Sequence, residues 1–173
     1  MRLTQRIIAM FVVMGMALVP QPVFAGADTH FPADWKKWKP LNTVMSQVGG
    51  LPGCDADVSS LPAIYQETVA TYCALRPEGP GKAQVLVKPA SVDAYTARKG
   101  KYANGENFIL HLKDLKVIFV TGHKGGTPIY GAYTEDGQDI TAASGPLATK
   151  TCITCHSGFT AFCSNGQCGR VIK

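Results

Sequence analysis

Residues 108–134 read FILHLKDLKVIFVTGHKGGTPIYGAYT, and this stretch decides the fold. Two apolar runs, 108–112 and 117–121, flank a polar segment at 113–116, which predicts an antiparallel hairpin. A glycine-containing loop is expected at 122–127 because Gly and Thr dominate it. The alternation that follows predicts a further strand over 128–134.

The pattern outside this stretch is mixed. A β-branched, alternating run predicts one more strand at 83–88. Helices are expected at 32–39, 61–75 and 92–99. Trp35 and Trp38 lie three apart in the first of these and are expected to share a buried face. The fold class predicted is therefore α+β, a mostly antiparallel β-sheet with a few short helices.

The N-terminus has the order of a secretory signal peptide. Arg2 and Arg6 form a positive region, an apolar run follows at 7–19, and Val-Phe-Ala ends at Ala25. The run is short for a membrane span, which favours a cleaved signal peptide over the alternative of an uncleaved membrane anchor. We expect 1–25 to be removed, leaving 26–173 as a single domain in the periplasm.

Charge is modest and scattered. The chain has 17 Lys and Arg against 12 Asp and Glu, a formal net charge of +5, and loss of Arg2 and Arg6 lowers it to +3. No basic stripe is interleaved with aromatic residues, so nucleic acid is not an expected partner. The cluster Lys36, Lys37 and Lys39 is expected to be a solvated face, with docking of an acidic redox partner as the alternative.

The chemistry is concentrated in Cys152-Ile-Thr-Cys155-His156, a C-x-x-C-H motif. Two thiols at this spacing can add to the two vinyl groups of haem, and the adjacent imidazole can ligate its iron. Attachment takes place after export, in agreement with the signal peptide. We therefore expect one covalent haem c in a C-terminal attachment loop, bound by Cys152 and Cys155, with His156 as the proximal iron ligand.

Three other uses of these cysteines are open. A redox disulfide would be expected in a thioredoxin-like βαβ context, which the sequence lacks. A zinc site would use Cys152, Cys155, Cys163 and Cys168, at a spacing shorter than that of usual zinc ribbons. A plain disulfide framework is the third alternative.

Four cysteines remain if two bind haem, and they allow three pairings. We favour Cys54–Cys73, which would tie a Gly-rich loop to the helix at 61–75, and Cys163–Cys168, which would close a small loop after the haem motif. The alternative is a free thiol that ligates iron.

The sixth iron position is the main functional question. Met45 is the one methionine after the signal peptide, and the histidines besides His156 are His30, His111 and His123. A low-spin electron carrier would need one of these four. If none binds, the iron is five-coordinate and open to a small ligand.

Beyond the motif, the order of segments resembles the cytochrome P-460 family and its relative, the beta-type cytochrome c-prime. The segments that carry the resemblance are PADWKKW (32–38), VLVKPASVDAYTARKGKYANGENFILHLKD (85–114), GGTPIYGAYTEDGQ (125–138) and the C-x-x-C-H close to the C-terminus. The resemblance implies an antiparallel sheet domain that commonly forms homodimers. It also implies a five-coordinate haem that binds nitric oxide and similar small nitrogen compounds.

Hydroxylamine-oxidising members of the family add a covalent bond from a strand lysine to the haem. The corresponding residue here would be Lys113, with Lys116 next, unless both are solvent-facing turn lysines. Packing on the distal face would come from Phe108, Phe119 or Tyr130. The functions expected are nitric oxide binding or detoxification, with hydroxylamine oxidation or simple electron transfer to a periplasmic partner as alternatives.

Overall fold

The computed structural model describes residues 26–41, 43–44, 52–78, 83–158, 163–168 and 170–171, so the predictions for 1–25 and for Met45 fall outside the described residues. The elements run in the order η1 Trp35–Lys37, β1 Lys39–Leu41, β2 Thr43–Val44, α1 Ala63–Leu75, β3 Ala83–Val87, η2 Pro89–Ser91, α2 Val92–Ala97, β4 Gly105–Leu112, η3 Lys113–Leu115, β5 Val117–Lys124, β6 Thr127–Thr134, α3 Thr149–Gly158, β7 Cys163–Ser164, β8 Gln167–Cys168 and β9 Arg170–Val171. In the described part of the chain, no helix is both long and apolar enough to cross a bilayer.

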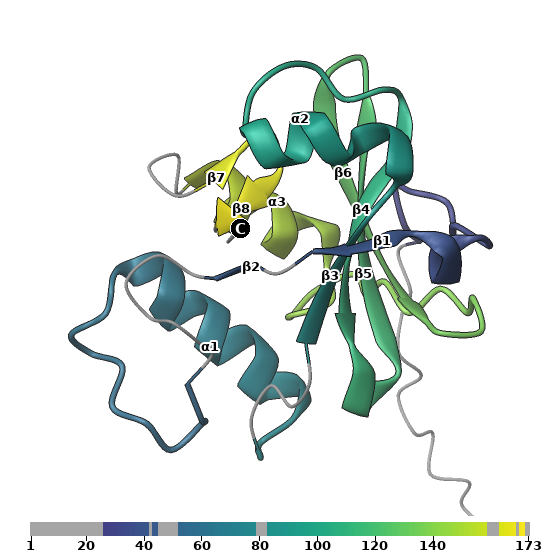
Figure 1. Cartoon of the computed structure of the whole chain (residues 1–173). Coiled ribbons are helices and arrows are strands. Elements are labelled where there is room, and N and C mark those ends of the chain that lie inside the picture. Colours follow the sequence, from purple (N-terminus) through teal and green to yellow (C-terminus); the bar gives the residue numbers. More distant parts are fainter. Residues whose placement is uncertain are drawn as a thin grey trace, which may run out of the picture.

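A five-stranded antiparallel sheet in the order β1-β3-β4-β5-β6 forms the centre of the fold (Figure 1). Two short strand pairs, β2 with β9 and β7 with β8, lie outside it. The expected α+β class with an antiparallel sheet is therefore confirmed. The hairpin predicted from the two apolar runs is also confirmed. Strands β4 and β5 pair antiparallel, from Leu112 opposite Val117 to Gly105 opposite His123.

The loop predicted at 122–127 was wrong. Strand β5 continues to Lys124, and β6 begins at Thr127, opposite Lys124. Gly125 and Gly126 both have positive φ, 60° and 84°, and connect the strands as a two-residue turn. A turn of this kind needs left-handed backbone at both central positions, which glycine adopts without steric cost. The sequence indicated a loop because of these two glycines, but they form a short turn that lets both strands extend to it.

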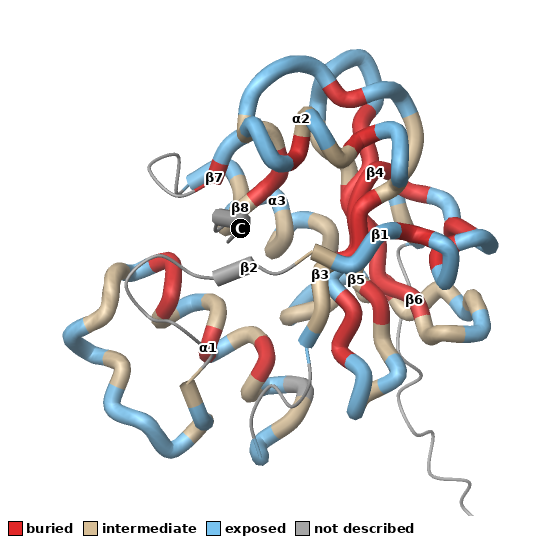
Figure 2. Tube along the Cα trace, viewed as in Figure 1, coloured by how far each residue is buried: buried red, intermediate tan, exposed pale blue. Residues whose placement is uncertain are grey.

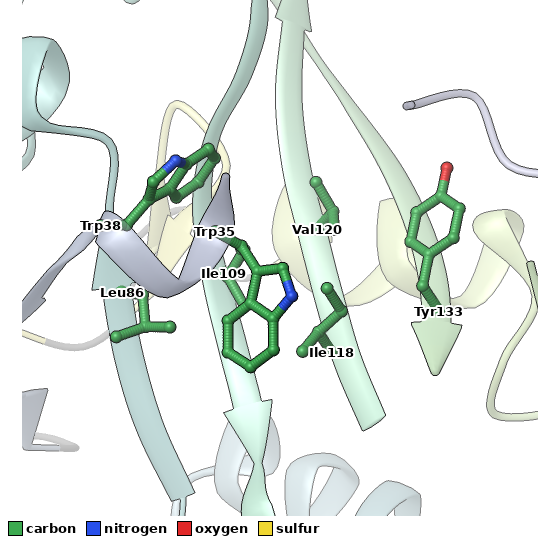
Figure 3. Packing of buried hydrophobic residues seen from close by; sticks show 7 residues of the cluster. All are labelled: Trp35, Trp38, Leu86, Ile109, Ile118, Val120 and Tyr133. Carbon is green, nitrogen blue, oxygen red and sulfur yellow. The ribbon is translucent and has the colours of Figure 1, made fainter. Parts of the chain in front are cut away.

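One face of the sheet is closed by η1, and we call it the tryptophan face. Trp35 and Trp38 are 6% and 3% exposed, so their predicted burial is confirmed. The first predicted helix is shorter than expected, because the chain enters β1 at Lys39 and its Pro40 cannot donate to a helix. The cluster, drawn in Figure 3, consists of Trp35, Trp38, Leu86, Ile109, Ile118, Val120 and Tyr133.

Side chains alternate between the two faces, so the residues next to the tryptophan cluster point to the opposite side. We call this side the Leu110 face. Helix α2 covers one part of it, where Tyr95 packs edge-on against Phe108 at 5.1 Å and Tyr102 does so at 5.6 Å. Buried residues follow the central strands and one side of α1 (Figure 2).

The outer edge of β6 is occupied by other parts of the chain. The Tyr130 carbonyl accepts a hydrogen bond from the Asp28 amide at 3.1 Å, and the Ala132 carbonyl accepts one from Ile140 at 2.9 Å. The Ala132 amide donates to Thr141 Oγ1 at 3.0 Å. A Cβ on Gly131 would lie 2.6 Å from Ala27 Cβ, so the approach of the N-terminal segment requires glycine there.

Candidate functional site

The C-x-x-C-H residues lie on helix α3, Thr149–Gly158, and not on the loop that we expected. Its first turn is fixed by the Ala148 carbonyl, which accepts hydrogen bonds from the amides of Thr151 at 2.9 Å and Cys152 at 3.3 Å. Positions i, i+3 and i+4 of a helix share one face. A helix therefore brings the two thiols and the imidazole to one side, which a loop would not do by itself.

The two thiols of the motif are free, in contrast to the other four cysteines. Cys152 and Cys155 form no disulfide and are half-buried. Burial raises the pKa of each to about 11, so both are protonated near neutral pH. The structure contains the two disulfides favoured by sequence, Cys54–Cys73 and Cys163–Cys168.

The ring of His156 is held through Nδ1. This nitrogen lies 2.9 Å from the Gly166 carbonyl oxygen, which can only accept, so Nδ1 carries the proton. Cys168 Sγ lies 3.5 Å from the same nitrogen. Burial lowers the pKa of His156, and the Gly166 carbonyl partly opposes this. Nε2 has no hydrogen-bond partner among the described residues, so its lone pair is available to a metal.

The partner of His156 is the turn between β7 and β8. Asn165 and Gly166 have φ values of 53° and 82°, which suit a two-residue hairpin turn. Cys163 and Cys168 face each other across the strands and are joined by their disulfide. Sequence reasoning missed this turn, although an Asn-Gly pair between two cysteines is a recognisable hairpin signal.

The first turn of α1 packs against Cys155 of α3 and against the β7–β8 hairpin. Ile64 and Tyr65 pack with Cys163, and Cys155 and Cys168 border the same cluster. The Cys54–Cys73 disulfide ties the other half of α1 to the segment that precedes it. The start of the helix that the sequence predicted at 61–75 therefore packs beside the motif.

The Leu110 face carries an apolar row that other side chains leave partly uncovered. Register places Leu110 opposite Val85 on one side and Phe119 on the other, and Phe119 opposite Ala132. Leu110 is 38% exposed although it lies on the central strand. Ile153 of α3, between the two motif cysteines, is 45% exposed. A contiguous row of partly exposed apolar side chains, here Val85, Leu110 and Phe119, is typical of a surface that binds an apolar group.

Tyr130 belongs to the same face and contacts the motif directly. Its ring centroid lies 5.0 Å from that of His156, with the planes at 49°. Its hydroxyl is buried and has no hydrogen-bond partner in the described residues. Of the three residues expected to pack distally, Tyr130 therefore lies beside the expected proximal ligand. Phe108 is buried beneath α2, and Phe119 lies half-buried in the apolar row.

Two of the other histidines are engaged elsewhere. His123 accepts a hydrogen bond from the Asn107 amide at Nδ1, 3.0 Å away, and donates from Nε2 to the Asn165 carbonyl at 2.9 Å. His111 lies on the tryptophan face and donates from Nε2 to Glu135 at 2.6 Å. The side chain of His30 is exposed. Neither His111 nor His123 offers a free nitrogen on the side of α3.

The lysines proposed for a haem crosslink lie in the turn between β4 and β5. Lys113 begins η3 and Lys116 follows it in a left-handed conformation, with φ of 54°. Both side chains are exposed to solvent. This placement agrees with the alternative that both are turn lysines whose side chains face solvent.

The chain matches no protein-family model, and no curated protein or solved structure is significantly similar to it. The functional argument therefore depends on the residues themselves. The structure does not contain the four-cysteine zinc site, because Cys163 and Cys168 are joined to each other by a disulfide. Among the described residues, no group of three or more His, Cys, Asp and Glu side chains could hold a metal ion.

Proposed function

We propose that the chain is an exported monohaem c-type cytochrome that binds a small ligand such as nitric oxide. In this proposal, Cys152 and Cys155 hold the haem through thioethers and His156 ligates its iron. The observation that carries the proposal is that two free thiols and an imidazole with an available Nε2 share one face of α3. The other four cysteines are paired and cannot compete for the cofactor.

The surroundings of the motif fit an apolar, planar group. The row through Leu110 and Phe119 leaves apolar surface uncovered on the face of the sheet where Tyr130 contacts His156 of α3. Burying the exposed part of one leucine contributes about 1 kcal/mol, and a whole row contributes more. Bound haem would supply an iron centre that exchanges electrons and takes up a diatomic ligand.

The chain's own residues then have separate tasks. His156 presents Nε2 because its Nδ1–H is bonded to Gly166. Tyr130 packs against the imidazole and limits its rotation. The apolar row would exclude water from the same side of the sheet once the haem covered it.

An open sixth coordination position is supported by the histidines. His123 uses both ring nitrogens within the protein, and His111 lies on the opposite face of the sheet. Binding of a small nitrogenous or gaseous ligand agrees with the resemblance to the cytochrome P-460 and beta-type cytochrome c-prime group. The described histidines therefore favour ligand capture over electron transfer with a second axial histidine.

The test is to produce the full chain in a host with haem-ligation machinery and to purify it from the periplasm. We expect an intact mass of the cleaved chain plus one haem, and a high-spin spectrum that shifts when nitric oxide or carbon monoxide is added. A colourless protein would overturn the cytochrome assignment. A low-spin spectrum that neither gas changes would overturn the ligand-binding assignment and leave the covalent haem standing.

A further inference from the structure

We infer that the Asn165–Gly166 turn, closed by the Cys163–Cys168 disulfide and gripped by His123, is the element that positions His156 toward the iron. The inference deepens the proposed function and rests on it. It assigns roles to the second disulfide and to a buried histidine, neither of which touches the reacting centre. Both are positioning residues that act through the turn.

The contact between the turn and His156 is specific. The peptide after Gly166 presents its carbonyl oxygen 2.9 Å from Nδ1, and Cys168 Sγ lies 3.5 Å from the same atom. A hydrogen bond from the second nitrogen of a metal-bound imidazole fixes its tautomer and ring orientation, and raises its basicity as a ligand. The orientation of the His156 ring therefore depends on the position of the Gly166 carbonyl group.

The residue before that carbonyl group is held by His123. The Nε2–H of His123 donates to the Asn165 carbonyl at 2.9 Å, one peptide before the group that His156 uses. His123 is 1% exposed, and its Nδ1 accepts from Asn107 at 3.0 Å. Asn107 is fixed in turn by Ser91, whose hydroxyl lies 2.8 Å from Asn107 Oδ1. A chain of buried hydrogen bonds therefore runs from η2 through β4 and β5 to the turn.

Two further features restrict the turn. The Tyr102 hydroxyl donates to Gln167 Oε1 at 3.2 Å, and the Asn165 amide donates to the Gly100 carbonyl at 3.3 Å. Gly166 packs so closely that a Cβ there would lie 2.8 Å from Pro128 Cβ. The turn is thus fixed by covalent closure, by hydrogen bonds to Gly100 and Tyr102 and to His123 of β5, and by steric contact with β6.

The functional consequence concerns the balance between ferric and ferrous iron. A more basic imidazole favours the ferric state, so an intact Nδ1–H to Gly166 bond lowers the reduction potential. Releasing the turn weakens that bond. We therefore expect variants that loosen the turn to favour ferrous iron. The expected change in the ferrous-to-ferric ratio is about tenfold, the lower end of the effects that partners of metal ligands have on metal affinity or activity.

The experiment compares two double variants of the holoprotein. Cys163→Ala/Cys168→Ala removes the disulfide at the turn, and Cys54→Ala/Cys73→Ala is the matched control that removes the disulfide of α1. At a fixed ambient potential, the first is expected to raise the ferrous-to-ferric ratio about tenfold, equal to ~59 mV for a one-electron couple. Its iron–histidine stretching band should also move to lower frequency. The control should leave both quantities unchanged.

A second pair keeps the inference testable if the turn variant fails to fold. His123→Leu removes the donor to Asn165, whereas His123→Gln keeps one donor and one acceptor. We expect the leucine variant to shift the ratio and the stretching band, and the glutamine variant to restore them. Normal values in both Cys163→Ala/Cys168→Ala and His123→Leu, in a wild-type protein that carries His-ligated haem, would overturn the inference alone. Absence of haem from the wild type would overturn the proposed function as well.

Discussion

Tyr130 of β6 and His156 of α3 lie with their ring centroids 5.0 Å apart, and this contact joins the sheet to the motif helix. Tyr130 is 3% exposed, and its hydroxyl has no partner among the described residues. Burial raises the pKa of this hydroxyl well above its usual range, with the nearby Cys152 as a smaller cause. The ring, and not the hydroxyl, therefore accounts for the stabilising part of the side chain.

Tyr130→Phe is expected to change the free energy of unfolding by less than about 1 kcal/mol, because no hydrogen bond to the chain is lost. Tyr130→Ala should cost about 3–5 kcal/mol, as removal of a buried aromatic ring does elsewhere. Urea unfolding followed by circular dichroism measures both. A phenylalanine variant as unstable as the alanine variant would mean that the hydroxyl carries a bond that the described residues do not reveal.

Leu110 tests whether an apolar group covers the uncovered row. Leu110→Gln should lower the unfolding free energy of the holoprotein by about 1–2 kcal/mol, because a polar side chain would then face that group. The same change should alter the apoprotein by no more than about 0.5 kcal/mol, since the side chain is already 38% exposed. Thermal unfolding of protein made with and without haem-ligation machinery gives both values, and equal effects in the two forms contradict the prediction.

Lys113 decides between a crosslinked haem and a plain thioether haem. Because the side chain is exposed in η3, we expect peptide mapping of the holoprotein to recover Lys113 and Lys116 unmodified. Lys113→Gln should change stability by no more than about 0.5 kcal/mol and leave the spectrum unaltered. Recovery of a haem-bearing peptide that includes Lys113 would instead support hydroxylamine oxidation.

His123 makes stability depend on pH. Burial lowers the pKa of His123 below its usual value, and the Asn165 carbonyl partly opposes the shift. Between the folded and unfolded pKa values, the unfolded chain binds more protons, so stability is complete above about pH 6.5 and is lost as pH falls toward the folded value. Urea unfolding at about pH 7 and pH 5 should show a smaller decrease for His123→Gln than for wild type, and equal decreases would contradict the assignment.

The sheet could be predicted because its strands carry their own signals. The two apolar runs around 113–116 and the alternating run at 83–88 correspond to β4, β5 and β3. Both disulfides were favoured because one would tie the Gly-rich loop to the helix at 61–75 and the other would close a small loop after the motif. The helix α3 was missed because Thr149–Gly158 is rich in Thr and Cys, which are weak helix formers, and because its amphipathic pattern is short.

Contacts between distant segments could not be predicted. The approach of Tyr130 to His156 depends on how α3 packs on β6. The hydrogen bond from His123 to Asn165 joins residues 42 apart in sequence. Neither leaves a local periodicity. Placement of Lys113 in an exposed turn, by contrast, agrees with the polar segment that the sequence predicted at 113–116 between the two strands.

The occupied edge of β6 limits how two copies of the chain can associate. A continuous intermolecular sheet needs a row of unpaired backbone donors and acceptors, and the outer groups of Tyr130 and Ala132 are already bonded to the chain itself. At the other edge, β1 is three residues long and its central Pro40 has no N–H to offer. Both margins are therefore protected against strand addition and the aggregation that follows from it, so a homodimer would have to associate through faces or loops.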